Sequence, residues 1–416
     1  MAPKKIAVLG AGIVGCTTAY ALTQAGFEVT LIDAQAEPAA LTSRANGAQL
    51  SYSYVEPLAS SATLRGLPAM LLTPNSPLKL RPALDTAQWI WGWNFLRACT
   101  RARANSTTRS LLELGALSRQ ALDGWLAKEG WPCDHAEAGK LVLYGTERAL
   151  QSGRTQVALQ ATWGTQQSVL SQQECVAREP ALESYTQQFA GAVYTASECV
   201  ADPYQLCSAL VNSISQQGAY FMPKCAVLEM RATAAGVTLN TTQGEQHFDS
   251  LVLCSGNQTA LFERELGLRG AVYPIKGYSV TLALKNAALA PRVSVTDLKR
   301  KTVFARLGDR LRVAGRAEIV GHDTRIETKR IAELIAATEA LFPGACLQTD
   351  PQPWVGLRPA TATGLPIISA TRLPGVFVNL GHGALGLTLA AGAAQLVTAL
   401  VQGSDALIKT QQFAIK

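Results

Sequence analysis

Three glycines and one aspartate near the start of the chain have the spacing of a dinucleotide-binding site. Gly10, Gly12 and Gly15 form a G-x-G-x-x-G turn, and Asp33 follows farther along the chain. The first glycine permits a tight turn, the second lets the backbone approach a pyrophosphate, and the third allows a helix to pack closely on a strand. Asp33 can accept hydrogen bonds from both hydroxyls of an adenosine ribose. No arginine directly follows it to hold a 2′-phosphate.

The elements that must position these residues can be recognised in the sequence. A short apolar run from Lys5 to Leu9 predicts a strand, and the pattern from Ile13 to Gln24 predicts a helix. Phe27 to Ile32 predicts a second strand, which ends at Asp33. The N-terminus of the helix, with Ile13 and Val14, should face the phosphate charge. This segment alone leaves open whether the dinucleotide is NAD or FAD.

Two later segments favour a flavin. Phe248 to Asn257 predicts a buried strand that returns to the same parallel sheet and opens into a turn at Ser255 and Gly256. A strand from Gly375 to Leu380 precedes a second glycine-rich loop, in which we expect Gly381, His382, Gly383, Leu385 and Gly386 to contact the cofactor. The N-terminus of a helix favours negative charge, and a reduced isoalloxazine carries that charge around N1 and C2=O.

Three further motifs connect the chain with a known family. They are Ser43-Arg44-Ala45-Asn46-Gly47-Ala48-Gln49, Tyr273-Pro274-Ile275-Lys276-Gly277-Tyr278-Ser279 and Trp354-Val355-Gly356-Leu357-Arg358-Pro359. With them, from Ile6 to about Val401, the chain resembles the FAD-dependent amine and amino-acid oxidoreductases of the D-amino-acid oxidase and glycine oxidase type. Within that family the resemblance is to the bacterial D-amino-acid dehydrogenases.

The resemblance implies FAD as cofactor, oxidative deamination of D-amino acids, and transfer of the electrons to a quinone or another acceptor instead of oxygen. It also implies cofactor contacts by Ser43, Arg44, Asn46, Gly47, Ala48, Gln49 and Val227. The family usually has an acidic residue in place of Leu41, an apolar one in place of Arg44, and a small or polar one in place of Arg316. We therefore expect differences in substrate range, while the fold is retained.

Oxidation of an amino acid at its α-carbon needs few protein groups. The protein must hold the carboxylate, keep the amine neutral and present the Cα–H to flavin N5. A carboxylate in a partly dry pocket calls for arginine. Arg358 matches the substrate-carboxylate arginine of the family, and a structural ion pair is the alternative for it.

Five further side chains are candidates for the catalytic site. Tyr278 could donate its hydroxyl to the substrate carboxylate, or be an ordinary strand tyrosine, and Lys276 could stabilise negative charge at the pyrimidine end of the flavin. Tyr52 and Tyr54 point to opposite faces of an extended segment, so one of them could line the pocket. His382 could bond flavin or substrate, unless its loop acts through backbone N–H groups alone.

Two alternative functions remain open at this point. An oxidase or dehydrogenase of glycine, sarcosine, proline or another secondary amine would share every motif. A non-catalytic flavin-binding subunit of a membrane dehydrogenase complex would not need Arg358 or the segment from Lys276 to Ser279. The sequence lacks a G-x-S-x-G hydrolase motif and any spacing typical of a metal site, so we expect no metal. The 37 Lys and Arg residues form no run typical of nucleic-acid binding.

The expected fold is α/β, with a Rossmann-like FAD-binding domain interleaved with an α+β substrate domain on a largely antiparallel sheet. Residues 1–60, 195–265 and 350–416 are expected to form the FAD-binding domain, and residues 61–194 and 266–349 the substrate-binding domain. Asp202 and Pro203 predict the start of a helix that runs to about Ser215. With 48% hydrophobic and only 16% charged residues, the chain should bury a large core.

Composition also bears on location. Nine cysteines without a C-x-x-C pair predict buried thiols in a reducing compartment, the cytoplasm. Trp89, Trp91 and Trp93 could touch the inner face of the cell membrane, or instead belong to a helix whose tryptophans face the active-site cavity. The uncharged stretch from Ala384 to Val401 predicts a buried helix of small residues in preference to a membrane span. The sequence makes no prediction of oligomeric state.

Overall fold

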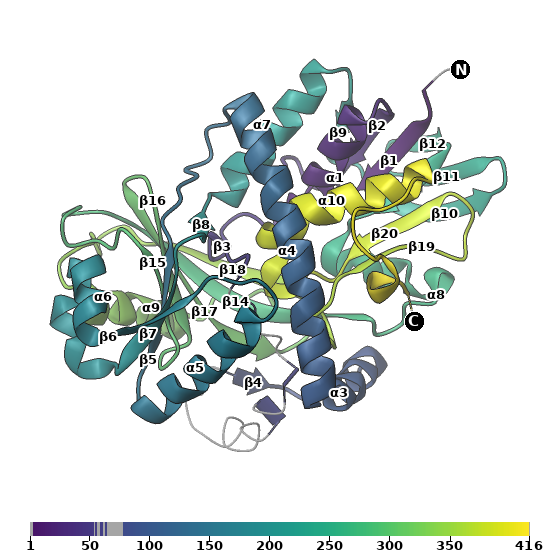
Figure 1. The fold of residues 1–416 in the computed structure, drawn as a ribbon. Coiled ribbons are helices and arrows are strands. Elements are labelled where there is room, and N and C mark those ends of the chain that lie inside the picture. The colour runs from purple at the N-terminus through teal and green to yellow at the C-terminus, as the bar shows by residue number, and fades with distance from the viewer. Residues whose placement is uncertain (1–2, 54, 56–58, 61–62, 65–77, 416) are drawn as a thin grey trace.

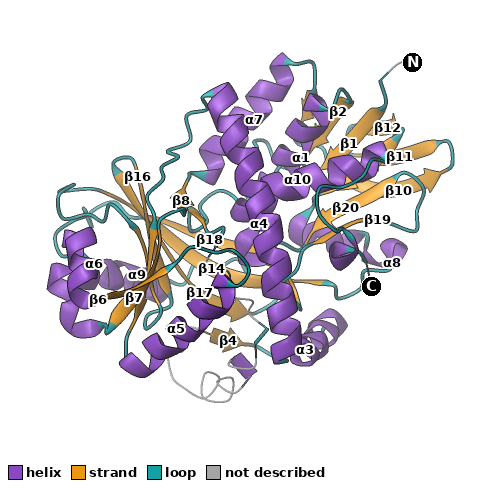
Figure 2. Ribbon diagram, in the orientation of Figure 1, coloured by secondary structure: helices purple, strands orange, loops and turns teal. Residues whose placement is uncertain are grey.

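The computed structural model describes residues 3–53, 55, 59–60, 63–64 and 78–415. Two large sheets lie on opposite sides of the molecule in the view of Figure 1, and helices cover them. Figure 2 shows the same arrangement by secondary structure, with the long helix α4 (Arg101–Glu129) crossing the middle of the view. The expected α/β architecture with sheets of mixed orientation is confirmed.

The first sheet is the expected dinucleotide-binding sheet. In the described chain its order is β19 (Ile367–Ala370), β20 (Val376–Leu380), β13 (Ser250–Leu253), β1 (Lys5–Leu9), β2 (Glu28–Ile32) and β9 (Tyr220–Met222). β1 runs parallel to both β2 and β13, and β13 runs parallel to β20. Three segments far apart in the sequence therefore form one sheet. Helix α1 (Ile13–Gln24) begins directly after the glycine turn, as predicted.

The second sheet is largely antiparallel. Its order is β18 (Gln352–Thr361), β14 (Val272–Ala283), β17 (Arg310–Ile319), β16 (Thr302–Leu307), β15 (Ser294–Asp297), β5 (Lys140–Tyr144), β7 (Gly191–Thr195) and β6 (Ser168–Ser171), and β4 (Leu78–Leu80) pairs with β17. β18 belongs to this sheet, although its residues lie in a segment expected for the cofactor domain.

Smaller elements complete the described fold. β10 (Val227–Thr233), β11 (Gly236–Thr241) and β12 (Gly244–Phe248) form one small sheet, and β3 (Gln49–Leu50) pairs with β8 (Cys199–Val200). The remaining helices are α3 (Thr86–Ala98), α5 (Glu147–Ala161), α6 (Gln172–Arg178), α7 (Pro203–Gln216), α8 (Glu263–Leu266), α9 (Thr328–Leu341) and α10 (Gly386–Gln402), with 3₁₀ turns at Pro180–Gln188, Gly256–Leu261, Gly383–Leu385 and Gln411–Phe413. Asp202 caps α7 through the N–H groups of Tyr204 and Gln205, which confirms the predicted start of that helix.

Strand β14 separates two environments. Because side chains alternate along a strand, Tyr278 packs with Val280 in the hydrophobic cluster under α9, whereas Ser279 lies on the opposite face. The neighbouring strand β17 contains a bulge, since its register with β14 shifts between Lys276 and Tyr278. Arg316, at this bulge, has a φ of 66°, a left-handed conformation that is rare for residues other than glycine.

Helix α10 is buried, as its small uncharged residues predict. It is long and apolar enough to span a membrane, but two thirds of its apolar window is buried inside the protein. It packs against α1 and α4, and Gly392 makes the closest approach to α4. A Cβ atom there would lie 2.7 Å from the Ser118 nitrogen and 2.8 Å from the Leu114 oxygen, both of which are backbone atoms. Only glycine fits this crossing.

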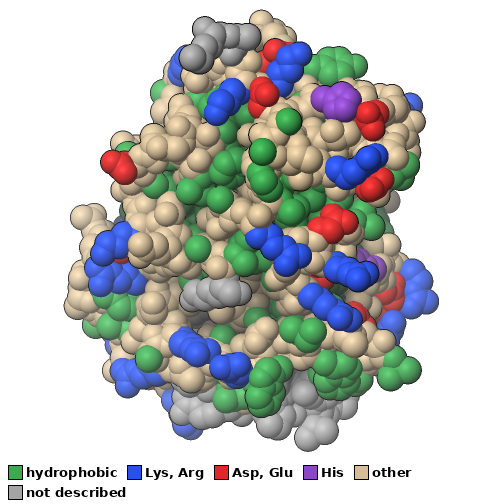
Figure 3. All heavy atoms as spheres, turned by 90° about the vertical axis from the view of Figure 1, so that its right-hand side faces the viewer, with side chains coloured by type: hydrophobic (Ala, Val, Ile, Leu, Met, Phe, Trp, Pro, Cys, Tyr) green, Lys and Arg blue, Asp and Glu red, His purple; other side chains and the backbone are tan. Residues whose placement is uncertain are grey.

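Helix α3 is divided between the core and the surface. Trp91 is buried, and its indole N–H donates to the Ala360 carbonyl at 2.8 Å. Trp89 and Trp93 are 61% and 63% exposed. Figure 3 turns the right-hand side of Figure 1 toward the viewer and shows large hydrophobic side chains beside Lys and Arg at the lower edge of this face. The three tryptophans therefore do not share one role.

All nine cysteines are buried, and none forms a disulfide. Burial raises the pKa of the Cys133 thiol to about 11 and that of the Cys254 thiol to about 12. Both thiols are therefore protonated at neutral pH and behave as small apolar side chains.

Gly392→Ala should destabilise the protein, because its methyl group would overlap the backbone of α4. We expect a loss of about 1 to 3 kcal/mol, measured by urea unfolding of the flavin-loaded protein. Gly124→Ala on α4 is the matched control, because its Cβ would meet nothing within 4 Å. That change should stabilise the helix by up to about 1 kcal/mol. Equal effects of the two substitutions would contradict the packing role of Gly392.

Candidate active site

The turn between β1 and α1 can only be built from glycine at two positions. Gly10 has a φ of 105°, and a Cβ there would lie 2.7 Å from the carbonyl oxygen of Cys254. A Cβ on Gly15 would lie 1.7 Å from the Gly10 oxygen. The predicted reasons for these two glycines, a tight turn and close packing of helix on strand, are therefore met.

Asp33 and Ser43 complete this end of the site. The Asp33 carboxylate accepts hydrogen bonds from the N–H groups of Ala11 at 2.6 Å and Gln35 at 2.7 Å. Burial raises the pKa of Asp33, although these two hydrogen bonds act to lower it. The Ile13 N–H donates to the Ser43 hydroxyl at 3.0 Å, so Ser43 lies at the N-terminus of α1. Anionic phosphate is favoured at such a position.

A cavity of about 1280 Å³ runs from this end to the N-terminus of α10, between the two sheets. It has space for a dinucleotide and a small substrate. Sixteen of the expected cofactor residues line it: Gly10, Gly12, Ile13, Val14, Asp33, Ser43, Asn46, Gly47, Ala48, Gln49, Ser255, Gly256, His382, Gly383, Leu385 and Gly386.

Four expected cofactor residues are not among those that line the cavity. Gly15 lies in the helix–strand packing described above, and Gly381 forms a turn with a φ of 77°. The Arg44 side chain pairs with Glu37 at 2.6 Å instead of facing the cavity. Val227 is buried in a separate hydrophobic cluster. The structure thus gives these residues roles in packing or at the surface.

The segment from Ala45 to Ser51 forms one wall of the cavity, and side chains of the second sheet hold it. Ser279 donates to the Ala45 carbonyl at 2.5 Å, and Arg312 donates to the Asn46 carbonyl at 3.0 Å. Gln49 donates to the Ser294 hydroxyl at 2.6 Å.

Lys140 completes this row with a hydrogen bond to the Ser51 hydroxyl at 2.7 Å. The sequence analysis missed Arg312, Ser294 and Lys140. The one available signal is strand alternation, which places Arg312 on the same face as Ala314. A lysine at the start of a strand gives no signal, since strand ends are usually solvated.

Arg358 is positioned by backbone groups. Its Nη1 donates to the carbonyl oxygen of Arg316 at 2.9 Å, and the guanidinium lies over Gly277, where a Cβ would be 2.3 Å from Nη2. It lines the cavity, and burial lowers its pKa, although an arginine remains a cation. Among the described residues, no carboxylate forms an ion pair with Arg358, so the expected structural ion pair is not found there. A half-buried cation in a cavity wall favours an anionic ligand.

Tyr278 lies differently from the expectation. Its hydroxyl donates to Glu318 at 3.2 Å on the α9 face of the sheet, and burial with this carboxylate raises its pKa. Glu318 also accepts from Arg330 at 3.0 Å. Tyr278 is among the residues that line the cavity, but its hydroxyl is directed at Glu318, so its expected contact with a substrate carboxylate stays a prediction.

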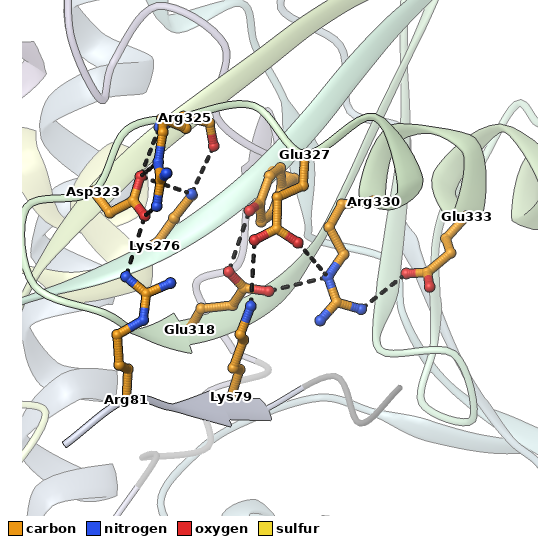
Figure 4. Close-up of polar contacts among 10 residues, drawn as sticks. Lys79, Arg81, Lys276, Glu318, Asp323, Arg325, Glu327, Arg330 and Glu333 are labelled. Carbon is orange, nitrogen blue, oxygen red and sulfur yellow. Dashed lines mark hydrogen bonds and ion pairs between the residues drawn. The ribbon is translucent and has the colours of Figure 1, made fainter. Parts of the chain in front are cut away.

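Lys276 is also turned away from the cavity. Figure 4 shows its ammonium directed at the loop between β17 and α9, where it donates to the Arg325 carbonyl at 2.6 Å and lies 3.6 Å from Asp323. In the same view Arg81 contacts Asp323 from β4, at 3.4 Å. Lys276 does not line the cavity. Its expected role at the flavin is therefore corrected to an ion pair that holds this loop.

Of the two candidate tyrosines of the 52–54 segment, the structure describes Tyr52, which is not among the residues that line the cavity. Tyr52 is 4% exposed and packs in the core cluster around α1. Its hydroxyl has no hydrogen-bond partner among the described residues. Tyr54 lies outside the described residues. Tyr52 is therefore not the pocket-lining member of the pair, and its backbone N–H donates to Glu198 at 2.7 Å, while the expectation for Tyr54 stays a prediction.

His382 remains a candidate. It lines the cavity, and its buried Nε2 has no hydrogen-bond partner within the described part of the chain. Burial lowers its pKa to about 3, so the imidazole is neutral at physiological pH. The indole nitrogen of Trp354, also in the wall, lacks a described partner too. Both residues therefore line the cavity, while these two nitrogen atoms are themselves buried without a described hydrogen-bond partner.

FAD fits this arrangement. The glycine turn and Asp33 suit its pyrophosphate and ribose, and Gly383–Leu385 and α10 present backbone N–H groups at the other end. A Cβ on Gly47, in the cavity wall, would lie 3.1 Å from the Val303 side chain, so glycine avoids a close contact there. Two anion-binding helix starts in one cavity suit a flavin dinucleotide.

Comparisons with known proteins agree with this geometry. Residues 5–400 match the DAO family model, described as FAD dependent oxidoreductase. D-amino acid dehydrogenase 2 of Ralstonia nicotianae is 41% identical over 99% of both chains. D-amino acid dehydrogenase 2 of Pseudomonas aeruginosa is 38% identical over 95% of this chain and 94% of its own.

Among solved structures, glycine oxidase from Geobacillus kaustophilus has a TM-score of 0.76 over 99% of both chains, at 19% identity. L-proline dehydrogenase from P. horikoshii has a TM-score of 0.73 over 99% of this chain and 96% of its own, at 14% identity. At these identities the likeness concerns the fold alone. The family match and the curated relatives, in contrast, cover nearly the whole sequence, and the chain belongs to the DAO family of FAD-dependent oxidoreductases.

Proposed function

We propose that this protein is a D-amino-acid dehydrogenase that converts free D-amino acids to 2-oxo acids and ammonia. The observation that carries the proposal is Arg358, a half-buried arginine that lines the cavity and has no ion pair with any described carboxylate. Such a group binds the carboxylate of an amino acid bidentately. The relatives at 41% and 38% identity are named D-amino acid dehydrogenases. The same names support an electron acceptor other than oxygen, for which a quinone is the expected class.

In this proposal the chain's own residues bind and orient the substrate. Arg358 holds the carboxylate, and His382 in the same cavity wall is neutral, so that it adds no charge beside the substrate. FAD, when bound, accepts the α-hydrogen with its two electrons, and water then hydrolyses the imino acid to the 2-oxo acid and ammonia.

The test is anaerobic reduction of the flavin in the purified protein. We expect D-amino acids to bleach its visible absorbance and L-isomers to leave it unchanged. Bleaching by sarcosine, glycine or L-proline alone would favour the secondary-amine alternative and contradict the proposal. A flavin that no amine or amino acid reduces would instead favour the non-catalytic subunit. An acceptor assay then compares a soluble quinone with oxygen, and faster turnover with the quinone is expected.

Arg358→Leu should raise the substrate concentration needed for half-maximal bleaching by about 30- to 1000-fold. This range corresponds to about 2 to 4 kcal/mol for the loss of a buried charged contact. The oxidised flavin spectrum should stay unchanged, because Arg358 acts on the substrate. Arg372→Leu is the control, since this exposed arginine donates only to the carbonyls of Arg264 and Glu265. An unaltered substrate dependence in Arg358→Leu would remove the carboxylate assignment.

We also propose that the α3 surface, formed by Leu84, Trp89, Ile90, Trp93 and Leu96, docks on the inner face of the cell membrane. These side chains are between 37% and 109% exposed. No acidic residue occurs between Asp85 and Glu113, whereas Arg97, Arg101 and Arg103 are exposed there. Indole rings beside arginines suit a surface of anionic lipids. The buried, disulfide-free cysteines support a reducing cytoplasmic location.

The double variant Trp89→Ala and Trp93→Ala should lose most binding to liposomes that contain phosphatidylglycerol, measured by flotation. Binding should also fall with salt and with pure phosphatidylcholine, since the arginines contribute through charge. Tyr220→Ala, at an aromatic residue that is 59% exposed on β9, is the control and should float like the unmodified protein. If the unmodified protein stays unbound at low salt, this surface is not a membrane contact.

A further inference from the structure

Lys140 is a buried lysine whose contact with the 45–51 segment, described above, does not require a charge. It is the first residue of β5, is 5% exposed, and lines the cofactor cavity. Its ammonium donates to the Ser51 hydroxyl at 2.7 Å. A lysine is almost never buried in this way without a task, because removing an ammonium from water is unfavourable.

Two hydrogen bonds connect Lys140 to the start of α10. The Ser51 N–H donates to the hydroxyl of Thr388 at 3.0 Å, and Thr388 lies in the first turn of that helix. Both Ser51 and Thr388 line the cavity. Lys140 therefore lies at the α10 end of the cavity. The phosphate turn and Asp33 define the adenosine end, so the isoalloxazine ring belongs at the end where Lys140 lies.

The surroundings keep Lys140 charged near neutral pH. Burial lowers its pKa to about 8, and the carboxylate of Glu198 acts against this decrease. Glu198 accepts hydrogen bonds from the N–H groups of Tyr52 at 2.7 Å and Ser53 at 2.8 Å. The positive end of the α10 dipole and the Lys140 ammonium thus act on the same region of the cavity.

We propose that Lys140 tunes the flavin, by stabilising the negative charge that the pyrimidine end of the ring acquires on reduction. When the ring takes up two electrons and one proton, it carries a net negative charge around N1 and C2=O. A nearby cation in a dry site stabilises that state over the neutral oxidised ring and raises the reduction potential. This is the role the sequence suggested for Lys276, which lies on the opposite face of the same sheet.

The test measures the flavin midpoint potential by anaerobic equilibration with a redox dye, in Lys140→Met, Lys140→Gln and Lys276→Met. In both Lys140 variants the equilibrium constant for flavin reduction should fall at least tenfold. For a two-electron couple this lowers the midpoint potential by about 30 mV. Lys276→Met removes an equally buried lysine and should leave the potential unchanged. A wild-type potential in both Lys140 variants, or an equal decrease in Lys276→Met, would overturn the proposal.

Ser51→Ala tests whether Lys140 acts through its charge or by holding the 45–51 segment in place. It removes the hydroxyl that Lys140 contacts but leaves the ammonium in place, so the potential should stay near the wild-type value. A decrease as large as that of Lys140→Met would mean that Lys140 only holds the 45–51 segment, and would contradict the proposal.

If the Lys140 variants fail to retain FAD, the wild-type protein decides the question. Its potential measured against pH should fall more steeply above about pH 8, where Lys140 loses its proton and the stabilisation ends. A plot without a change of slope in that range would overturn the proposal.

Discussion

The alternation of side chains along β14 determines which groups of the second sheet can reach the cofactor. Ser279 and Gly277 face the cavity, where one holds the 45–51 segment and the other leaves room for the Arg358 guanidinium. Tyr278 and Lys276 are their immediate neighbours and face α9. A shift of one residue in this strand would exchange the two sets, placing a lysine and a tyrosine in the cofactor space. The register of β14 therefore underlies both the shape and the charge of the site.

The bulge in β17 affects both the α9 face of the sheet and the contact with Arg358. Downstream of Arg316 the side chains are displaced, so that Glu318 meets Tyr278 and Arg330 on the α9 face. At the bulge itself, the Arg316 carbonyl is free of the sheet ladder and accepts from Arg358. The left-handed conformation of Arg316 costs about 1 kcal/mol. The strained residue is thus the one whose carbonyl orients Arg358, for which we propose substrate binding.

Local patterns predicted much of the fold. The first strand, the helix from Ile13 to Gln24 and the cap at Asp202 follow from hydrophobic periodicity and short-range hydrogen bonding, and they were found as expected. The glycine-rich loops identified most of the residues that line the cofactor cavity. Glycine marks positions where the backbone takes a conformation that other residues rarely adopt. Lys276 and Tyr278 were assigned to the site because they lie in a motif of the family. A motif shows which residues are adjacent in the sequence, but it does not show toward which face of the strand each side chain points. Lys140 was missed because its burial depends on pairing with strands about 50 and 150 residues away.

The order of strands in the first sheet has a consequence for how the protein is made. β1, near the N-terminus, pairs with β13, which in turn pairs with β20, and α10 follows β20 as the last long element. The glycine turn emerges from the ribosome hundreds of residues before the helix that faces the other end of FAD. The cofactor cavity therefore cannot be completed until β20 and α10 have been made, and β1 lacks its partner β13 during much of synthesis. The FAD-binding sheet thus forms through contacts between distant segments, which makes its assembly slow compared with that of a local hairpin.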